Sequence, residues 1–268
     1  MKIFTLPNGK QFGTGLQLPS VRPMTMSAFA DEVPVWTAEQ IREVVTDTSW
    51  TSAREIFPAA QYQTDQGTSS ACNGFAATKA LTKARVLRGL PFEKLSGYSL
   101  YAQINGGRDQ GSMLDDGMHA IMNTGCAPES MILRGALYMS QIPGTARNEF
   151  VNFRAEKCYR CDAELELATA LAMRFMCVVA THVGDSWYRL NSDGVAGATR
   201  GVGNHAVQVD DVRWRNNQFQ FDHDGSWGLS YGQQGRAWLT WSGHLSEPNK
   251  YHAFYCIPTT VDGKQAAA

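Results

Sequence analysis

One cysteine and one histidine stand where nucleophilic chemistry could occur. Cys72 begins a stretch whose apolar residues recur at helical spacing up to a stop at Gly89 and Pro91. At the first turn of a helix, free backbone N–H groups and the macrodipole stabilise a thiolate and lower its pKa. His205 lies 133 positions later, at the start of a predicted strand. A thiolate and an imidazole held together can attack a carbonyl carbon, although each residue alone would also fit plain core packing.

Further motifs accompany this pair in a fixed order. They are Gln66-Gly67, Phe75-Ala76, Leu95-Ser96 with Leu100-Tyr101, Gly111-Ser112 through Gly125, Pro128-Glu129, Asn204-His205-Ala206, and Ser226-Trp227-Gly228 with Gly232 and Gly235. In type, order and spacing they resemble the papain-like cysteine peptidases in their short bacterial and phage forms. A histidine about 130 to 150 residues after the cysteine is part of that pattern. The resemblance covers residues 57–245.

The resemblance implies a catalytic pair with an oxyanion hole. Cys72 would be the nucleophile, and His205 would be the general base and acid. Gln66 would donate its side-chain amide to the oxyanion, with the backbone N–H of Cys72 as the second donor. Two fixed donors would stabilise the charge that develops on the carbonyl oxygen during attack.

The resemblance also implies contacts beside the pair. Gly111 and Ser112 lie where family members pair with the substrate backbone, and Trp227 would cover the histidine and keep its hydrogen bond dry. Asn73 replaces the family tryptophan that follows the cysteine, which alters the wall next to the nucleophile. Ser69 stands where the family has a disulfide cysteine, so a reducing compartment is compatible.

The residue that would orient the imidazole departs from the family pattern. Gly225 precedes Ser226-Trp227 at the position where the family has asparagine. The role needs only an acceptor for the imidazole N–H, which a carboxylate can supply. Asp224 is our candidate and Asp222 is the second, while the absence of any acceptor is the third option.

The elements that must position these residues are helices first and strands afterwards. Apolar spacing predicts helices at 37–45, 72–88, 113–122 and 165–171, and strands at 175–180, 206–209, 219–221, 237–241 and 253–256. This order predicts an α+β protein with the papain-like two-lobed fold. A mainly helical lobe, about residues 51–150, would precede an antiparallel β-sheet or barrel lobe, about residues 151–268, with the active site in the cleft between them.

Residues 1–50 form an N-terminal extension in this interpretation. They show many turns and one short helix, opened by a capping box at Thr37-Ala38-Glu39-Gln40. The inhibitory propeptides of family zymogens are long and helical, so we expect this extension to be structural and to pack on a lobe or on a partner.

Composition excludes several classes of protein. The 24 basic and 25 acidic residues form no long block of one sign, which argues against a nucleic-acid partner. No apolar stretch approaches the roughly 20 residues of a membrane-spanning helix, and Pro7 and Gly9 interrupt any secretion signal. We therefore expect no membrane partner and a cytoplasmic or virion-associated location.

Six cysteines are too few for a disulfide scaffold in a chain of 268 residues. Cys158 and Cys161 form a C-x-x-C pair, but a zinc site needs two further ligands and no second such pair follows. We expect ordinary loop thiols there, with metal or redox use as the alternative. No metal or cofactor is expected.

The sequence is compatible with two candidate functions. The first is a cysteine peptidase that hydrolyses peptide or isopeptide bonds of a polypeptide substrate through an acyl-enzyme. The second is a catalytically reduced papain-like domain that serves as a binding or structural component of a larger assembly, such as a phage particle, contacted through the N-terminal extension. Gly225 and Asn73 favour the second function, because both replace family residues that flank the catalytic pair.

Overall fold

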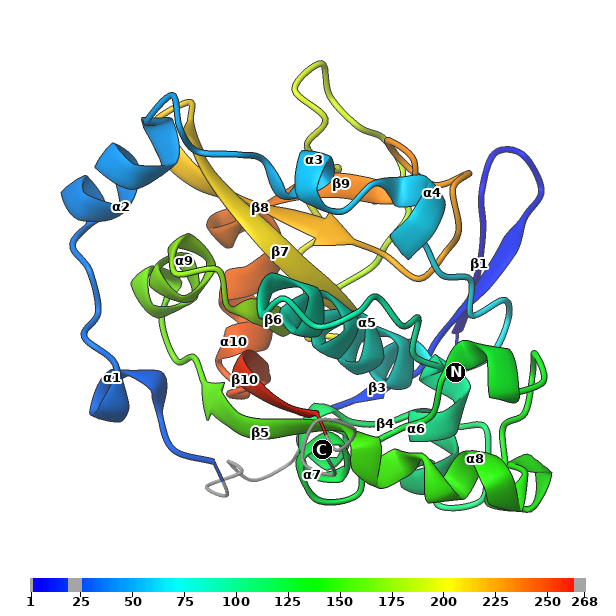
Figure 1. Cartoon of the computed structure of the whole chain (residues 1–268). Coiled ribbons are helices and arrows are strands. Elements are labelled where there is room, and N and C mark those ends of the chain that lie inside the picture. The colour runs from blue at the N-terminus through cyan, green and yellow to red at the C-terminus, as the bar shows by residue number, and fades with distance from the viewer. Residues whose placement is uncertain (1, 19–25, 263–268) are drawn as a thin grey trace.

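The computed structural model describes residues 2–18 and 26–262. Within them the largest sheet has six antiparallel strands in the order β5-β10-β6-β7-β8-β9. The strands of this sheet are β5 (Phe153–Arg160), β6 (Met176–Thr181), β7 (His205–Arg215), β8 (Gln218–Asp224), β9 (Arg236–Thr240) and β10 (Phe254–Asp262). Helix α5 packs against β6, β7 and β10 (Figure 1).

Most helices precede this sheet in the chain. They are α1 (Phe29–Glu32), α2 (Ala38–Thr46), α3 (Ala53–Ile56), α4 (Ala59–Tyr62), α5 (Cys72–Leu87), α6 (Gly97–Ile104), α7 (Leu114–Asn123), α8 (Gly144–Asn148), α9 (Glu164–Ala172) and α10 (Ser246–Asn249). Short 3₁₀ turns lie at Glu129–Met131, Met139–Gln141 and Phe150–Asn152, and a π-helical turn lies at Trp241–Leu245.

The predicted order of elements is confirmed. Thr37 caps α2 through reciprocal hydrogen bonds with Gln40, as the capping box predicts. Helix α5 begins at Cys72, and its residues 72–85 are all buried between the sheet and the helices α6 and α7. The mixed helices and antiparallel strands make this an α+β fold.

Strand β5 is not among the strands that the sequence predicts, and it determines the surroundings of two cysteines. Cys158 lies within β5 and Cys161 directly follows it, so the expectation of loop thiols is wrong. Both side chains are buried, and neither forms a disulfide. A bulge in the pairing of β5 with β10 breaks the alternation of buried and exposed residues. The alternating polarity that predicts a strand is therefore missing from this part of the sequence.

The N-terminal extension contributes its own strands. β1 (Lys2–Thr5) and β2 (Gln11–Thr14) form an antiparallel hairpin, and β3 (Leu16–Gln17) pairs in parallel with β4 (Ser112–Met113). These strands are two to four residues long and lie among turns, which is why the sequence indicated only a turn-rich segment. The described helices include none that is long and apolar enough to cross a membrane.

The main core lies between α5 and the sheet. Leu81 of α5 and Met176 and Val178 of β6 are completely buried in it. The core fixes one face of α5 against the strand that begins with His205. It thereby brings together two segments that are far apart in the sequence.

Candidate active site

Cys72 is the first residue of α5, as predicted, and its side chain is completely buried. Burial raises the pKa of the Cys72 thiol, and the backbone N–H groups of Ala206 and Gly15, which face the sulfur, offset only part of the rise. The expectation that the helix N-terminus lowers this pKa is therefore wrong for the form described here. In this form the cysteine is a neutral thiol.

His205 begins β7, one residue before the N–H group that faces the Cys72 sulfur. The predicted nucleophile and the predicted base thus lie on neighbouring segments, one at the start of α5 and one at the start of β7. The imidazole is 1% exposed, and this burial lowers the pKa of His205 to about 3. Among the described residues, none forms a hydrogen bond with its Nδ1 atom.

Gln66 holds its side chain in one orientation. Its Oε1 atom accepts a hydrogen bond from the hydroxyl group of Ser226, so its amide nitrogen points the other way. That nitrogen donates to the carbonyl oxygen of Gly13 at 3.1 Å and to that of Ser69 at 2.8 Å. The residue predicted as an oxyanion donor therefore binds a peptide carbonyl in the structure.

Residues 11–17, which we call the strap, cross this site. The N–H of Gly13 donates to the carbonyl oxygen of Gly67 at 3.2 Å, in the loop before α5. The N–H of Leu16 donates to the carbonyl oxygen of Asn204 at 3.2 Å, in the loop before β7. The strap thus contacts both segments, the one that leads to Cys72 and the one that leads to His205.

The predicted substrate-pairing residues also contact the strap. The N–H of Ser112 donates to the carbonyl oxygen of Gly15 at 2.9 Å, and Ser112 stands beside Leu16 in the parallel pairing of β3 with β4. A Cβ atom on Gly111 would lie 1.6 Å from the same carbonyl oxygen. Residues 111 and 112 therefore bind an extended peptide backbone, and that backbone belongs to this chain.

Two glycines let the strap lie this close to the loop before α5. A Cβ atom on Gly13 would lie 2.2 Å from the carbonyl oxygen of Ser69. A Cβ atom on Gly15 would lie 2.3 Å from the carbonyl oxygen of Ser70. Because backbone atoms cannot yield as a flexible side chain can, only glycine fits at either position.

Trp227 covers the imidazole, as predicted. Its ring lies 4.7 Å from that of His205 between centroids, and Phe12 of the strap stacks on it at 5.1 Å. Tyr231 meets it edge-on at 5.6 Å. Its indole N–H has no hydrogen-bond partner within residues 2–18 and 26–262.

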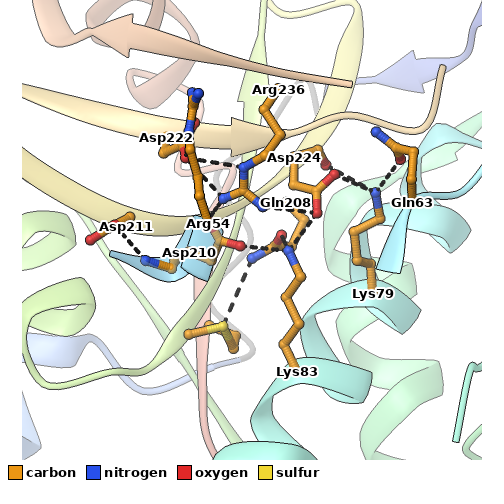
Figure 2. A network of polar contacts seen from close by, with 12 residues as sticks. Arg54, Gln63, Lys79, Lys83, Gln208, Asp210, Asp211, Asp222, Asp224 and Arg236 are labelled. Carbon is orange, nitrogen blue, oxygen red and sulfur yellow. Dashed lines mark hydrogen bonds and ion pairs between the residues drawn. The ribbon is translucent and has the colours of Figure 1, made fainter. Parts of the chain in front are cut away.

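The carboxylate that we predicted to hold His205 has other partners. Asp224 accepts hydrogen bonds from Lys79 at 2.7 Å, from Arg236 at 3.1 Å and from Lys83 (Figure 2). Burial alone would raise the pKa of Asp224, but these three cations outweigh it and hold the pKa well below the usual range. The predicted role of Asp224 is thus corrected, because its oxygens face cations and not the imidazole.

The second candidate, Asp222, belongs to the same network. Its oxygens accept from Arg236 at 2.9 Å and from Arg54 at 2.7 Å. Lys83 and Arg236 also bind Asp210, which completes a set of three buried carboxylates and four cations, of which Arg54 is half-buried and the other three are buried (Figure 2). Lys79 and Lys83, which stand at the i and i+4 positions of a helix that is predicted to be buried, were the available signal for this set.

Asn73, the residue that replaces the family tryptophan, has a structural task. Its amide nitrogen donates to the hydroxyl oxygen of Ser112 at 3.0 Å and to the carbonyl oxygen of Met113 at 2.6 Å. It therefore anchors β4, the strand that pairs with the strap, to the first turn of α5. Over the described parts of the chain, no group of three or more His, Cys, Asp and Glu side chains is placed to hold a metal ion.

No family model matches this chain, and no curated protein does. Solved structures do match it. Xylellain, a cysteine protease from Xylella fastidiosa, is 18% identical over 92% of this chain and 97% of its own, with a TM-score of 0.64. ProCathepsin B S9 from Trypanosoma congolense is 14% identical over 93% and 87%, with a TM-score of 0.68.

A third match is the structure of the cysteine protease and lectin-like domains of Cwp84, a surface layer associated protein of Clostridium difficile. It is 18% identical over 79% of this chain and 52% of its own, with a TM-score of 0.63. At these identities the likeness concerns the backbone arrangement. The chain has the papain-like fold that these cysteine proteases share.

Proposed function

We propose that this protein is a cysteine peptidase that hydrolyses peptide or isopeptide bonds of a polypeptide substrate. One observation carries the proposal: the amide of Gln66 holds the peptide carbonyl of Gly13, two residues before Gly15, whose backbone N–H faces the Cys72 sulfur. The backbone that supplies this carbonyl continues along Ser112. An extended peptide bound in this way supports the proposal, because acyl transfer needs fixed donors at the carbonyl oxygen of the substrate.

The mechanism follows from the positions of the groups. His205 takes the proton of the Cys72 thiol, and the thiolate attacks the substrate carbonyl to form a C–S bond. The side chain of Gln66 and the backbone N–H of Cys72 stabilise the oxyanion. The C–N bond then breaks as His205 returns its proton to the leaving amine. Water, activated by His205, cleaves the thioester and restores the thiol.

We further propose that the form described here is closed and inactive. Cys72 and His205 are both buried, with a raised thiol pKa and a lowered imidazole pKa, so that both are neutral. Substrate can enter only when the strap leaves. Exposure to water then removes the burial that keeps the thiolate–imidazolium pair from forming.

The first test adds one methyl group to the strap, which should displace the strap and expose Cys72. In Gly15→Ala, the new Cβ meets the Ser70 backbone, and Gly144→Ala is the matched control because a Cβ there meets nothing within 4 Å. We expect Gly15→Ala to speed iodoacetamide labelling of Cys72 by about tenfold or more, since overpacking costs roughly 1–3 kcal/mol and each 1.4 kcal/mol is tenfold. The control should label as slowly as the wild type.

The Gly15→Ala variant also tests whether His205 activates Cys72 and whether the protein hydrolyses a polypeptide. Adding His205→Ala should slow labelling at neutral pH by about 10², the usual contribution of a general base. Gly15→Ala should also hydrolyse fluorescein-labelled casein, and Cys72→Ala should abolish this. An exposed Cys72 that labels equally fast with and without His205 would refute the peptidase.

That outcome would favour the second function, a catalytically reduced domain in a larger assembly. Its supporting observation is the closed site itself, in which two neutral groups lie under a strap held by backbone hydrogen bonds. For such a domain, Gly15→Ala would alter stability without producing casein hydrolysis.

A further inference from the structure

Position 225 lacks a side chain, and a histidine fills the space beside it. A Cβ atom on Gly225 would lie 3.2 Å from Cε1 and 3.6 Å from Nδ1 of His223. The first distance is a tight contact, so the imidazole of His223 occupies the space into which a side chain at 225 would extend. Where the family has asparagine at 225, this chain presents a buried imidazole from two residues earlier on the same strand.

The strand geometry places His223 on the side of the sheet that carries His205. His223 pairs with Val209 across β7 and β8, and Val209 lies four residues after His205. Alternate residues of a strand share a face, so His205, Val209 and His223 point to the same side. Asp224 points to the other side, where the cationic network lies.

His223 is held rigidly on one side and left free on the other. Its Nε2 atom lies 3.2 Å from the hydroxyl group of Tyr231, and Trp187 stacks on its ring at 5.2 Å. Its Nδ1 atom is buried and has no hydrogen-bond partner in the described chain, and the same is true of Nδ1 of His205. Unpaired buried polar atoms are rare, and two of them on histidines of one face call for a shared explanation.

The two imidazoles also interact through charge. Burial lowers the pKa of His223 well below its ordinary value, and His205 lowers it further because two protonated rings would repel each other. Arg236 and Lys79 act in the same direction, and Asp224 opposes them. His223 therefore stays neutral when His205 takes up a proton, and a neutral imidazole keeps one nitrogen as an acceptor.

We propose that His223 is the positioning residue for His205, in place of the family asparagine. With its proton on Nε2, donated to the oxygen of Tyr231, its Nδ1 atom accepts the N–H of His205 through one water, because this Nδ1 has no direct partner among the described residues. The acceptor holds the imidazole in the rotamer and tautomer that take the thiol proton. This inference rests on the proposed peptidase function.

The test is the pH profile of Cys72 labelling by iodoacetamide in the full chain carrying Gly15→Ala. Adding His223→Ala should slow labelling at pH 7 by about tenfold or more, as loss of a partner that orients a functional histidine does. The acid limb of the profile should move to higher pH. Without its acceptor the imidazolium of His205 is less stable, so less of the thiolate–imidazolium pair forms and the Cys72 thiolate appears only at a higher pH. His223→Ala with Gly225→Asn should restore both.

A matched control separates positioning from packing. His244 is also buried and meets Trp187 edge-on at 5.7 Å, but its ring bonds the backbone N–H of Thr240. His244→Ala should destabilise the fold comparably and leave the acid limb in place. Fast, His205-dependent labelling that His223→Ala does not change would overturn the inference and leave the peptidase intact. Labelling independent of His205 would instead refute the peptidase.

A second readout does not depend on opening the strap. In the unaltered chain, imidazole ¹⁵N spectra report the tautomer of His205. We expect His223→Gln to shift the ¹⁵N signals of His205 and His244→Gln to leave them unchanged. Unchanged His205 signals in both variants would show that the two rings are not coupled, and would likewise overturn the inference.

Discussion

Gln66 acts on both the strap and the proposed chemistry. Its amide nitrogen donates to a strap carbonyl in the closed form, and the same nitrogen would donate to the oxyanion in the open form. The structure shows a buried side chain with hydrogen bonds to Gly13, Ser69 and Ser226, so its loss should also loosen the strap.

Gln66→Glu should therefore have two opposite effects, faster labelling of Cys72 and slower hydrolysis of casein. In the unaltered chain, labelling of Cys72 should become faster, because the strap loses an anchor. In the Gly15→Ala background, casein hydrolysis should fall by about 10² to 10³, the cost of one oxyanion donor. Gln103→Glu is the control, since its amide nitrogen also donates to two backbone carbonyls but lies in α6. An unchanged rate of hydrolysis would exclude Gln66 as the donor.

At the scale of elements, α5 is joined to the sheet by charges as well as by apolar packing. It carries Cys72 at its first turn and Lys79 and Lys83 further along, and the lysines bind carboxylates of β7 and β8. Burial lowers the pKa of Lys79 to about 8 despite the nearby Asp224. The network therefore depends on having all of its charges present.

Asp224→Asn should consequently lower the free energy of unfolding. Removing one charge leaves buried cations uncompensated, which typically costs about 3–5 kcal/mol. Asp193→Asn breaks the more exposed ion pair with Arg215 and should cost at most about 1 kcal/mol. Urea unfolding at pH 7 measures both. If Asp224→Asn kept full stability and moved the acid limb of Cys72 labelling, the carboxylate would be the histidine's acceptor after all.

For the whole molecule, three buried histidines predict sensitivity to mild acid. Burial lowers the pKa of His205 to about 3, that of His223 well below its usual value, and that of His244 to a lesser degree. Below pH about 6.5 these three histidines bind protons in the unfolded chain but stay neutral in the folded one. The free energy of unfolding therefore falls as the pH falls. Asp211, whose pKa burial raises to about 6, works in the opposite direction below that pH.

A variant isolates the contribution of one ring. His223→Gln should flatten the pH dependence of the free energy of unfolding by about 1.4 kcal/mol per pH unit below pH about 6.5. His119→Gln, at a half-exposed position of α7, should leave the slope as it is. Denaturant titrations between pH 5 and pH 7.5 provide the comparison. Equal slopes in the wild type and in His223→Gln would mean that His223 is protonated in the fold.

The sequence by itself determined most of the longer helices and strands, including the start of α5 at Cys72 and the start of β7 beside His205. Helical spacing predicted a helix from Cys72, and a β-branched run predicted the strand that follows His205. Both are local patterns of side-chain polarity, which the chain repeats every few residues. The order of motifs around Cys72 and His205 also predicted the fold class.

Tertiary structure alone decided what surrounds that pair. The partners of Asp224 lie on α5 and β9, so nothing adjacent in the sequence reveals that its carboxylate is already bound. Strand alternation turns Asp224 away from the face of Gly225 and brings His223 onto it, two residues away. The strap reaches Gln66 and Ser112 from 50 and more residues earlier, and its carbonyl oxygens accept hydrogen bonds from the side-chain amide of Gln66 and from the backbone N–H of Ser112. Such contacts depend on how distant segments pack, and local polarity does not encode that packing.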